Sequence, residues 1–244
     1  MEKLLKIAII GYGKMGHEIE KYAPSMKMKV VAIIDNPDDW QLYTEELKNA
    51  DVAIEFTSPD VVTANIMKLM DLGIPVVTGT TGWLNKLPEI QNYCEKSNGS
   101  LFYASNFSIG VNLFFVINKY LAKLMSQYAE YMISAKETHH TQKIDAPSGT
   151  AISMLEDILK ENDFYSGWKL AGENPGSDEI PVDAHRIEGV TGTHVVKYTS
   201  PIDTISLKHE AFNREGFARG ALMAASWLQD KKGIFTMNDL LNIK

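Results

Sequence analysis

The sequence contains very little cysteine: Cys94 is the only one among 244 residues. A single cysteine excludes an intramolecular disulfide and offers no paired spacing for binding a metal. This composition is typical of a reducing compartment. We therefore expect a cytoplasmic protein in which Cys94 serves as a small, buried apolar residue.

Long hydrophobic runs and concentrations of positive charge are also lacking. No stretch approaches the roughly 18 apolar residues of a transmembrane helix, and the apolar run near the first residue is too short for a signal peptide. Acidic residues outnumber basic ones by 31 to 24, and Lys and Arg form no cluster. We therefore predict no membrane and no nucleic acid as partners, so that any anionic ligand needs a local site.

The first half of the chain predicts a doubly wound α/β domain. Its apolar runs are rich in Val and Ile and do not alternate with polar residues, which is typical of strands that are buried on both faces of a parallel sheet. Segments with helical periodicity separate them. The runs are KIAII, KVVAIID, DVAIEFT, IPVVTGT and SLFYAS.

A second, α+β domain is predicted after a long amphipathic helix that runs from Ile109 to about Tyr128. Its apolar residues recur at helical spacing and are Val111, Phe114, Phe115, Ile117, Leu121, Leu124 and Met125. A strand, YMISAKETHH, and a helix from about Ala151 to Glu161 follow. Short turns then join three strand-like runs, which suits an open mixed or antiparallel sheet. These runs are IPVDAHRIEG, GTHVVKYTS and DTISLKHEAF, and a helix, GFARGALMAASWLQD, and a closing segment, GIFTMNDLL, complete the chain.

The turn GYGKMG lies between the first strand and a helix, and its spacing suits a dinucleotide. Gly11 allows the tight turn, Gly13 lets the backbone approach a pyrophosphate, and Gly16 lets helix and strand pack closely. The free amides of the helix N-terminus then face the phosphates. A purely structural turn is the alternative, but the flanking elements favour a nicotinamide cofactor bound at Gly11, Tyr12, Gly13, Lys14, Met15 and Gly16.

Asp35 ends the second predicted strand, where an acidic side chain can accept hydrogen bonds from the adenosine ribose. Such a carboxylate suits NADH and repels the 2'-phosphate of NADPH. Asn36 and Pro37 add no cation, and Lys14 is the only candidate nearby. We expect NADH with tolerance of NADPH, although Asp35 could instead cap the turn that follows.

Two further segments follow strands at the edge where open α/β sheets bind ligands. They supply small, hydroxylated and amide groups, although either alone could be an ordinary polar loop. The first contains Gly79, Thr80 and Thr81, and the second contains Ala104, Ser105, Asn106 and Phe107.

The stretch ETHHTQKIDAPSGTA concentrates groups that could hold and protonate an acid. Strand parity lets His139 and Lys143 share a face. Ser148 or Thr150 would cap the next helix, whose exposed amides with Gly149 make a carboxylate site. A histidine adds a proton that titrates near neutral pH, so the stretch suits a small dicarboxylic acid.

Simpler explanations exist for each feature of this stretch. Paired histidines are often incidental, a lysine at a strand end is usually solvated, and PSGT is a common cap. A metal is not expected, because Glu137, His139 and His140 lack a third partner at the usual spacing. The other histidines, His194 among them, lie far off in the sequence.

The same stretch resembles the signature of the 4-hydroxy-tetrahydrodipicolinate reductase (dihydrodipicolinate reductase) family. The resemblance extends to GTTGW, SNFSIGVN, the hairpin around Gly192 and His194, and GALMAASWL, so it covers nearly the whole chain. Family members usually have arginine at Lys14 and a basic residue at Asn36, which leaves the choice between NADH and NADPH open.

This resemblance implies a cofactor domain of residues 1–107 with 214–244, and a substrate and oligomerisation domain of residues 108–213 that builds a homotetramer. It implies that His139 is the catalytic acid or base and Lys143 the proton donor. The substrate carboxylates would be held by His140, Lys143, Ser148, Gly149 and Thr150.

The implied reaction is the NAD(P)H-dependent reduction of a cyclic dicarboxylate, 4-hydroxy-tetrahydrodipicolinate, in diaminopimelate and lysine biosynthesis. Two alternatives stay open at this point. One is another NAD-dependent dehydrogenase of an amino or imino acid, and the other is a nucleotide-sensing protein without turnover.

Overall fold

The computed structural model describes residues 4–243, and the chain divides into two compact units. Unit 1 comprises Met1–Ile109 and Arg214–Lys244, and unit 2 comprises Gly110–Asn213. Residues 1–3 and 244 of the predicted cofactor domain lie outside the described residues. None of the described helices is both long and apolar enough to cross a membrane.

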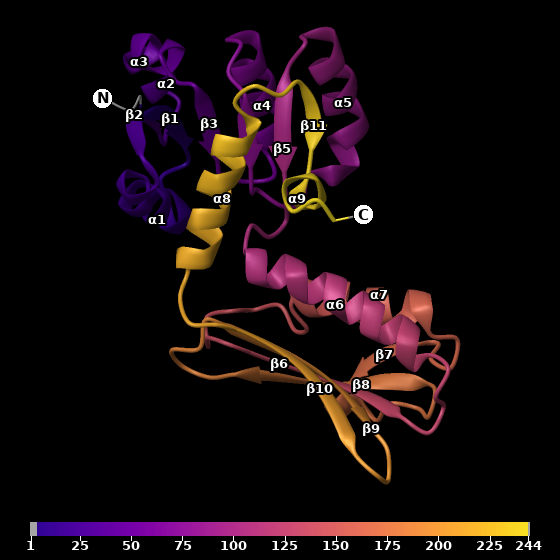
Figure 1. Ribbon diagram of the computed structural model, residues 1–244. Coiled ribbons are helices and arrows are strands. Elements are labelled where there is room, and N and C mark those ends of the chain that lie inside the picture. The colour runs from indigo at the N-terminus through magenta and orange to yellow at the C-terminus, as the bar shows by residue number, and fades with distance from the viewer. Residues whose placement is uncertain (1–3, 244) are drawn as a thin grey trace. The chain divides into compact units, whose positions relative to one another are not determined.

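Unit 1 is built on a six-stranded parallel sheet with the strand order β11-β5-β4-β3-β1-β2 (Figure 1). The five predicted strands are all present. Four of them contain Val or Ile, β5 contains Leu and Phe instead, and helices cover both faces of the sheet that they form. The closing segment contributes an unpredicted strand, which is too short to show a pattern and pairs with β5. The strands are β1 Leu5–Ile10, β2 Met28–Ile34, β3 Val52–Glu55, β4 Val76–Thr78, β5 Ser100–Tyr103 and β11 Gly233–Phe235.

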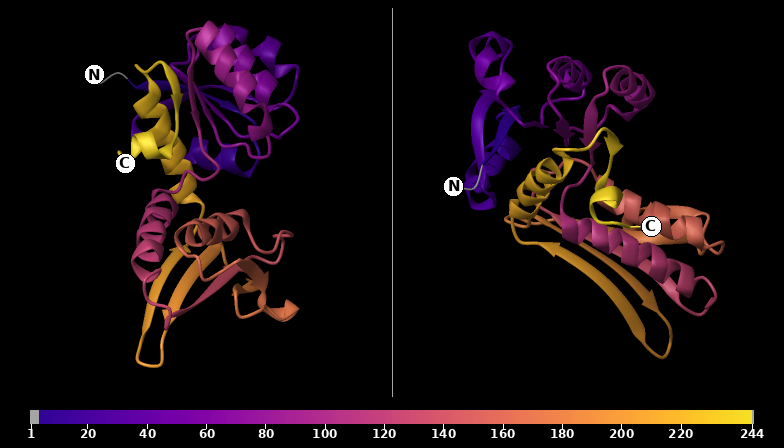
Figure 2. Two further views of the ribbon diagram at one scale, coloured as in Figure 1. Left: turned by 90° about the vertical axis from the view of Figure 1, so that its right-hand side faces the viewer. Right: turned by 45° about the horizontal axis from the view of Figure 1, so that its top comes forward.

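Helices cover both faces of this sheet (Figure 2). Alternate residues of β1 point to opposite faces: Ile7 and Ile9 pack with α1 and α8, and Ala8 and Ile10 pack in the cluster of α4 and α5. The main helices are α1 Lys14–Tyr22, α4 Val62–Asp71, α5 Leu87–Lys96 and α8 Glu215–Leu228. Short helical turns complete the unit, namely η1 Pro24–Met26, α2 Asp39–Leu42, α3 Thr44–Lys48, η2 Leu84–Lys86 and α9 Met237–Leu240.

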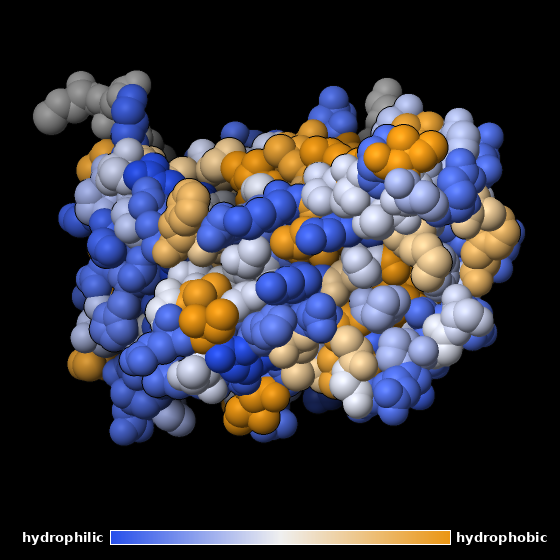
Figure 3. Space-filling view, turned by 90° about the horizontal axis from the view of Figure 1, so that it is seen from below, coloured by the Kyte–Doolittle hydropathy of each residue, from blue (hydrophilic) through white to orange (hydrophobic). Residues whose placement is uncertain are grey.

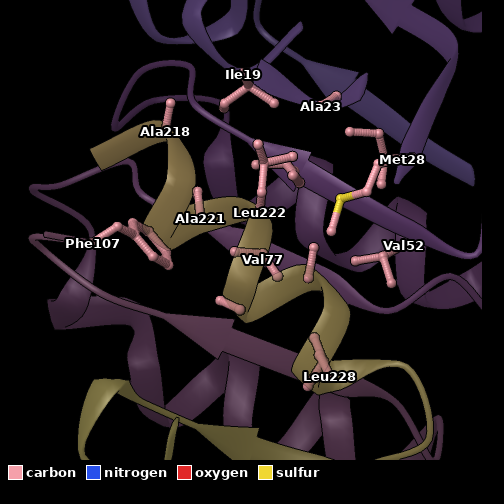
Figure 4. Close-up of a cluster of buried hydrophobic side chains, with 14 of the residues drawn as sticks. Ile19, Ala23, Met28, Val52, Val77, Phe107, Ala218, Ala221, Leu222 and Leu228 are labelled. Atoms are coloured by element: carbon pink, nitrogen blue, oxygen red, sulfur yellow. The ribbon is translucent and has the colours of Figure 1, made fainter. Parts of the chain in front are cut away.

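Helix α8 returns the chain to unit 1 through a face of small residues. Figure 4 shows Ala218, Ala221 and Leu222 directed into the cluster that contains Phe107. A Cβ atom on Gly220 would lie 1.8 Å from the carbonyl oxygen of Phe107, so only glycine permits this approach. The close packing holds the end of β5 and the loop after it against α8.

Unit 2 has a five-stranded mixed sheet with the order β10-β9-β6-β8-β7 and two helices on one face (Figure 1). β9 is antiparallel to β6 and β10, whereas β6, β8 and β7 are parallel. The strand β7 was not predicted, because its four residues are all half-buried and show no alternation. The elements are α6 Ile109–Met125, β6 Met132–His139, α7 Gly149–Glu161, β7 Gly167–Leu170, η3 Ala171–Glu173, β8 Glu179–Arg186, β9 Gly192–Thr199 and β10 Thr204–Ala211.

The apolar face of α6 is only partly buried. Phe114 and Met125 reach the core of unit 2, but Ile117 and Leu124, which share the predicted apolar spacing, are 51% and 44% exposed. The polar Asn118 occupies the buried face instead, where its Nδ2 donates to the carbonyl of Met154 at 2.9 Å. The helix was predicted correctly except that it ends at Met125, and its buried face was predicted only in part.

The face of the unit 2 sheet opposite these helices is open. It carries Met132, Ser134 and Lys136 of β6, and Val195 and Lys197 of β9. Figure 3, a view from the side of this sheet, shows mostly hydrophilic residues with separate hydrophobic patches. The sheet is therefore covered on one side only.

Candidate functional site

The glycine turn of unit 1 has the geometry that a pyrophosphate requires. Gly11 has a φ of +89°, and a Cβ there would lie 2.1 Å from the carbonyl oxygen of Phe56. A Cβ on Gly16 would lie 2.5 Å from the carbonyl oxygen of Gly11. Gly13 is the N-cap of α1 and has no side chain to occupy the first amides of the helix. The turn is thus a cradle of bare backbone that fits the phosphates of a dinucleotide.

A cavity of about 550 Å³ opens beside this turn at the carboxyl ends of the strands. Of the predicted cofactor residues, Gly11, Tyr12, Gly13 and Asp35 line it. Lys14, Met15, Gly16 and the segments 79–81 and 104–107 do not. Oδ1 of Asp35 accepts a hydrogen bond from the amide of Tyr12 at 2.7 Å, which ties the glycine turn to the end of β2. The other lining residues are Ile10, Ile34, Asn36, Pro37, Trp40, Phe56, Thr57, Ser58, Val61, Asn65 and Lys68.

Lys68 of α4 is a cation in this cavity that the sequence did not reveal. Its ammonium lies 4.0 Å from the centre of the Trp40 ring, which also lines the cavity. The interpretation of Lys14 as the only nearby cation is therefore wrong. No local motif marks Lys68, because the parallel sheet brings its helix beside Asp35 from a different part of the chain.

The loop after β4 is held by a buried acid, Glu55, whose side chain is 0% exposed. The hydroxyl of Thr80 donates to Oε2 of Glu55 at 2.9 Å and accepts from the amide of Thr57 at 2.8 Å. Thr78 and Thr57 also donate their hydroxyls to Glu55. Glu55 was missed, although an acid at the end of a buried strand is a usable signal.

The remaining predicted cofactor residues divide between surface and core. Thr81 and Ser105 are exposed, Gly79, Ala104 and Asn106 are half-buried, and Phe107 is 2% exposed. The ring of Phe107 stacks on Phe102 with centroids 5.8 Å apart. Its side chain belongs to the core, so only its backbone is suited to contact a ligand.

In unit 2, Glu137 and His139 point to the same buried face of β6, because they are two residues apart. The strand ends at His139, so His140 follows it and Lys143 lies in a turn. The parity argument for Lys143 is therefore wrong. A Cβ on Gly192 of β9 would lie 3.1 Å from Nε2 of His139, so glycine leaves room for this ring.

Helix α7 begins at Gly149, two residues before the predicted start, with Ser148 as its N-cap. Oγ of Ser148 accepts from the amide of Ala151 at 3.2 Å, which confirms one of the two predicted caps. The amide of Ser148 itself is not available, because it donates to Oε2 of Glu137 at 3.0 Å. Gly149 and Thr150 form the first turn, whose amides have no acceptor within the helix.

Glu137 is a fully buried carboxylate surrounded by donors. Oε1 accepts from Nη2 of Arg186 at 2.9 Å, and Oε2 lies 3.4 Å from Nδ1 of His139. Burial alone would raise the pKa of Glu137, but hydrogen bonds from His139, Ser148 and Arg186 lower it to about 2. The carboxylate is therefore ionised at neutral pH.

His194 of β9 is a second buried imidazole in the site, and the sequence did not identify it. The antiparallel register places it opposite Glu137, with its ring centroid 5.0 Å from that of His139. Burial and the neighbouring His139 lower the pKa of His194 to about 4, so its ring is neutral at neutral pH. Its Nε2 lies 3.2 Å from Oγ of Ser148.

Ligand atoms of Glu137, His139 and His194 lie within 4.8 Å of one another, so the cluster has a spacing that could hold a metal ion. Distance along the chain was therefore a poor reason to exclude His194. However, Arg186 and Ser148 already donate to the two oxygens of Glu137. Oε2 of Glu137 and Oγ of Ser148 both lie near Nε2 of His194. In a nucleophilic triad, the acid and the hydroxyl contact opposite nitrogens of the ring, so these three residues do not form one.

Lys143 lies on the loop between β6 and α7 with its side chain 25% exposed. Its ammonium is 2.9 Å from Oδ1 of Asp145. Burial would raise the pKa of Asp145, but the bond from Lys143 lowers it below the usual value. The positive charge of Lys143 also acts on the buried His194, where it contributes to the lowered pKa.

Comparisons with known proteins point to one family. Residues 5–107 match the family model described as dihydrodipicolinate reductase, N-terminus, and residues 110–241 match the one described as its C-terminus. A 4-hydroxy-tetrahydrodipicolinate reductase from Christiangramia forsetii is 44% identical over 98% of both chains. One from Clostridium novyi is 34% identical over 95% of this chain and 96% of its own.

Solved structures show the same fold. A dihydrodipicolinate reductase from Paenisporosarcina sp. TG-14, described as dipicolinate-bound, superposes with a TM-score of 0.75 at 24% identity, covering 99% of this chain and 100% of its own. A dehydrogenase from Clostridium difficile has a TM-score of 0.55 at 12% identity, covering 98% and 96%. The architecture is thus shared with enzymes of distant sequence.

Acid should destabilise the protein through His194. Its pKa falls from 6.5 to about 4 on folding, so the unfolded chain binds the proton first and stability decreases as the pH falls from about 6.5 to 4. Glu137 acts in a lower window, because its stabilisation is lost between about 4.5 and 2. In urea unfolding at a series of pH values, His194→Gln should remove up to about 3 kcal/mol of the loss in the upper window.

The exposed His185 provides the matched control, since His185→Gln should leave this pH dependence unchanged. A His194→Gln variant with the same loss of stability between pH 6.5 and 4 as the parent would contradict the assignment.

Proposed function

Because the chain belongs to the dihydrodipicolinate reductase family, we infer that it is an NAD(P)H-dependent oxidoreductase that reduces 4-hydroxy-tetrahydrodipicolinate to tetrahydrodipicolinate in diaminopimelate and lysine biosynthesis. The observation that carries this is the buried charged cluster at the start of α7, in a chain that is 44% identical to a named reductase along its length. We place it in the cytoplasm, which the single cysteine favours.

Unit 1 is the proposed dinucleotide-binding domain. The bare cradle at Gly11 and Gly13 holds the pyrophosphate, and Asp35 at the end of β2 accepts from the adenosine ribose. When bound, the nicotinamide supplies a hydride. We keep the proposed cofactor roles of the glycine turn and of the loops Gly79–Thr81 and Ala104–Phe107. Phe107 would contact the cofactor through its backbone only, because its side chain is buried.

Unit 2 is the proposed substrate-binding domain, and its ligand is a small dicarboxylate. The related structure from Paenisporosarcina, described as dipicolinate-bound, supports a ring with two acid groups. His140, Lys143 and the first turn of α7 at Ser148, Gly149 and Thr150 would hold those groups. Lys143 supplies a full positive charge and the helix N-terminus supplies oriented amides.

The reaction requires a proton as well as the hydride, and it releases water. In our proposal, Lys143 protonates the leaving hydroxyl or the reduced ring, and His139 acts as the acid or base beside it. His139 suits this role because Glu137 lies at its Nδ1, so the other nitrogen can face the ligand. The carboxylate contacts fix the ring during the transfer, which lowers the entropic part of the barrier.

Replacing the two proton-transfer residues should abolish most turnover. We expect His139→Ala and Lys143→Ala each to lower kcat by ~100-fold or more. The measurement is the oxidation of NADH and NADPH with substrate generated in place by the preceding synthase. NADH binding should persist in both variants, since unit 1 is unchanged.

His185→Ala serves as the control for His139→Ala, because His185 is an exposed histidine on β8. Near-normal turnover in both active-site variants would refute the assigned roles. A parent protein that oxidises neither cofactor would instead favour a nucleotide sensor, and one that reduces only other imino acids would favour a different dehydrogenase.

The carboxylate of Asp35 should set the cofactor preference. In Asp35→Asn the amide oxygen can still accept from Tyr12, but the charge that repels a 2'-phosphate is gone. We expect the ratio of kcat/KM for NADPH over NADH to rise on the order of tenfold. Asp38→Asn removes a charge from the same turn but not from the cavity, so an equal change there would refute the role of Asp35.

We also propose that the protein is a homotetramer assembled through the open face of the unit 2 sheet. This face presents residues of three neighbouring strands on one side of the domain, and a second copy could cover it. Sedimentation equilibrium should give the mass of four chains. Val195→Asp puts an acidic side chain on that face of every copy, so repulsion between copies should dissociate the assembly. A monomeric parent protein would contradict the proposal.

A further inference from the structure

Apart from two histidines, Arg186 is the only charged side chain paired with the buried Glu137 among the described residues. The two residues lie on the parallel neighbours β8 and β6, and the ion pair joins Nη2 to Oε1 at 2.9 Å. An isolated buried carboxylate would be very unfavourable, and the guanidinium helps His139 and Ser148 to keep Glu137 ionised in this position.

The other donors of Arg186 bind the loop that carries Lys143. Its Nε donates to the carbonyl oxygen of Lys143 at 3.1 Å, and Nη2 donates to the carbonyl oxygen of Asp145 as well as to Glu137. Nη1 donates to the carbonyl oxygen of His185 at 2.7 Å, within β8 itself. One planar group thus connects a buried acid, a strand and two positions of a loop.

This loop, residues 140–148, contains no helix or strand, so regular secondary structure cannot fix it. At its far end the amide of Ser148 donates to Oε2 of Glu137. Both members of the ion pair therefore hold the loop. Arg186 binds the carbonyl groups of Lys143 and Asp145, and Glu137 binds the amide of Ser148. Rigid placement of catalytic groups requires such supporting contacts.

We infer that Arg186, paired with the buried Glu137, is a positioning residue that holds the backbone of Lys143 at a set place relative to the start of α7. The inference rests on the proposed roles of Lys143 and Ser148, and it assigns to Arg186 no contact with the substrate. Its fork of donors is the property that matters, because an ammonium could neutralise Glu137 but could not also bind two carbonyl groups in fixed directions.

Arg186→Lys separates charge from geometry. The variant keeps a cation beside Glu137 and loses the fork, so Lys143 should lose its fixed position. We expect dipicolinate, as a probe, to bind about tenfold more weakly by calorimetry, and kcat to fall by a similar factor. In a chain that already carries Lys143→Ala, the same change should weaken dipicolinate binding by less than about twofold.

A merely structural role for Arg186 would give the same loss in both backgrounds, which would overturn the inference. Lys169→Met, which removes a more exposed ion pair between Lys169 of β7 and Glu179 of β8, should be neutral in both. Hydrogen exchange supplies a second readout. Amides of residues 140–148 should exchange faster in Arg186→Lys and in Arg186→Gln, while those of β6 and β9 stay protected.

The comparison of Arg186→Lys with and without Lys143→Ala also distinguishes a failure of this inference from a failure of the proposed function. Full dipicolinate affinity and turnover in Lys143→Ala would refute the role of Lys143, and with it the function that the positioning serves. A loss in Lys143→Ala, combined with additive effects of Arg186→Lys, would refute the positioning alone. Failure of both Arg186 variants to fold, while Lys143→Ala folds, would overturn it too, because the ion pair would then support the unit as a whole.

Discussion

The carboxylate of Glu137 is the constraint on which the active region of unit 2 depends. A carboxylate with no exposed surface needs hydrogen bonds from the protein around it, and each group that donates one is thereby held in place. Arg186 from β8 and the amide of Ser148 at α7 donate to it, and the rings of His139 and His194 lie beside it. Three strands, a helix and a loop therefore share one electrostatic centre.

Unit 1 uses a buried acid in a different way. Glu55 is as buried as Glu137, yet hydroxyl groups of Thr57, Thr78 and Thr80 surround it instead of cations. Thr78 ends β4, and Thr57 and Thr80 lie in the loops after β3 and β4, so Glu55 joins the two loops at the edge of the sheet where the dinucleotide is expected. Neutral donors add no positive charge there, which leaves Asp35 and Lys68 to set the charge of the cavity.

The features that the sequence predicted are those with local causes. A glycine turn, Val- and Ile-rich strands and a serine cap each depend on neighbouring residues, so most strands of the two sheets and the Ser148 cap of α7 were predicted, whereas β7 and β11 were not. His194, Arg186 and Lys68 were missed as site residues because their positions depend on strand register and helix packing between distant segments. The parity argument failed at Lys143 for a related reason: the strand ends at His139, and contacts from β8 place the loop beyond it.

The same reasoning explains why the fold alone does not specify the chemistry. A dehydrogenase that is only 12% identical in sequence shares the architecture. The cluster around Glu137, by contrast, requires particular residues on β6, β8 and β9 in one register. A slip of one residue in β9 would turn His194 to the open face and leave Ser148 beside a different side chain. The mixed sheet therefore does more than support the site: its register determines which imidazole, guanidinium and amide meet the buried carboxylate, and hence where Lys143 stands.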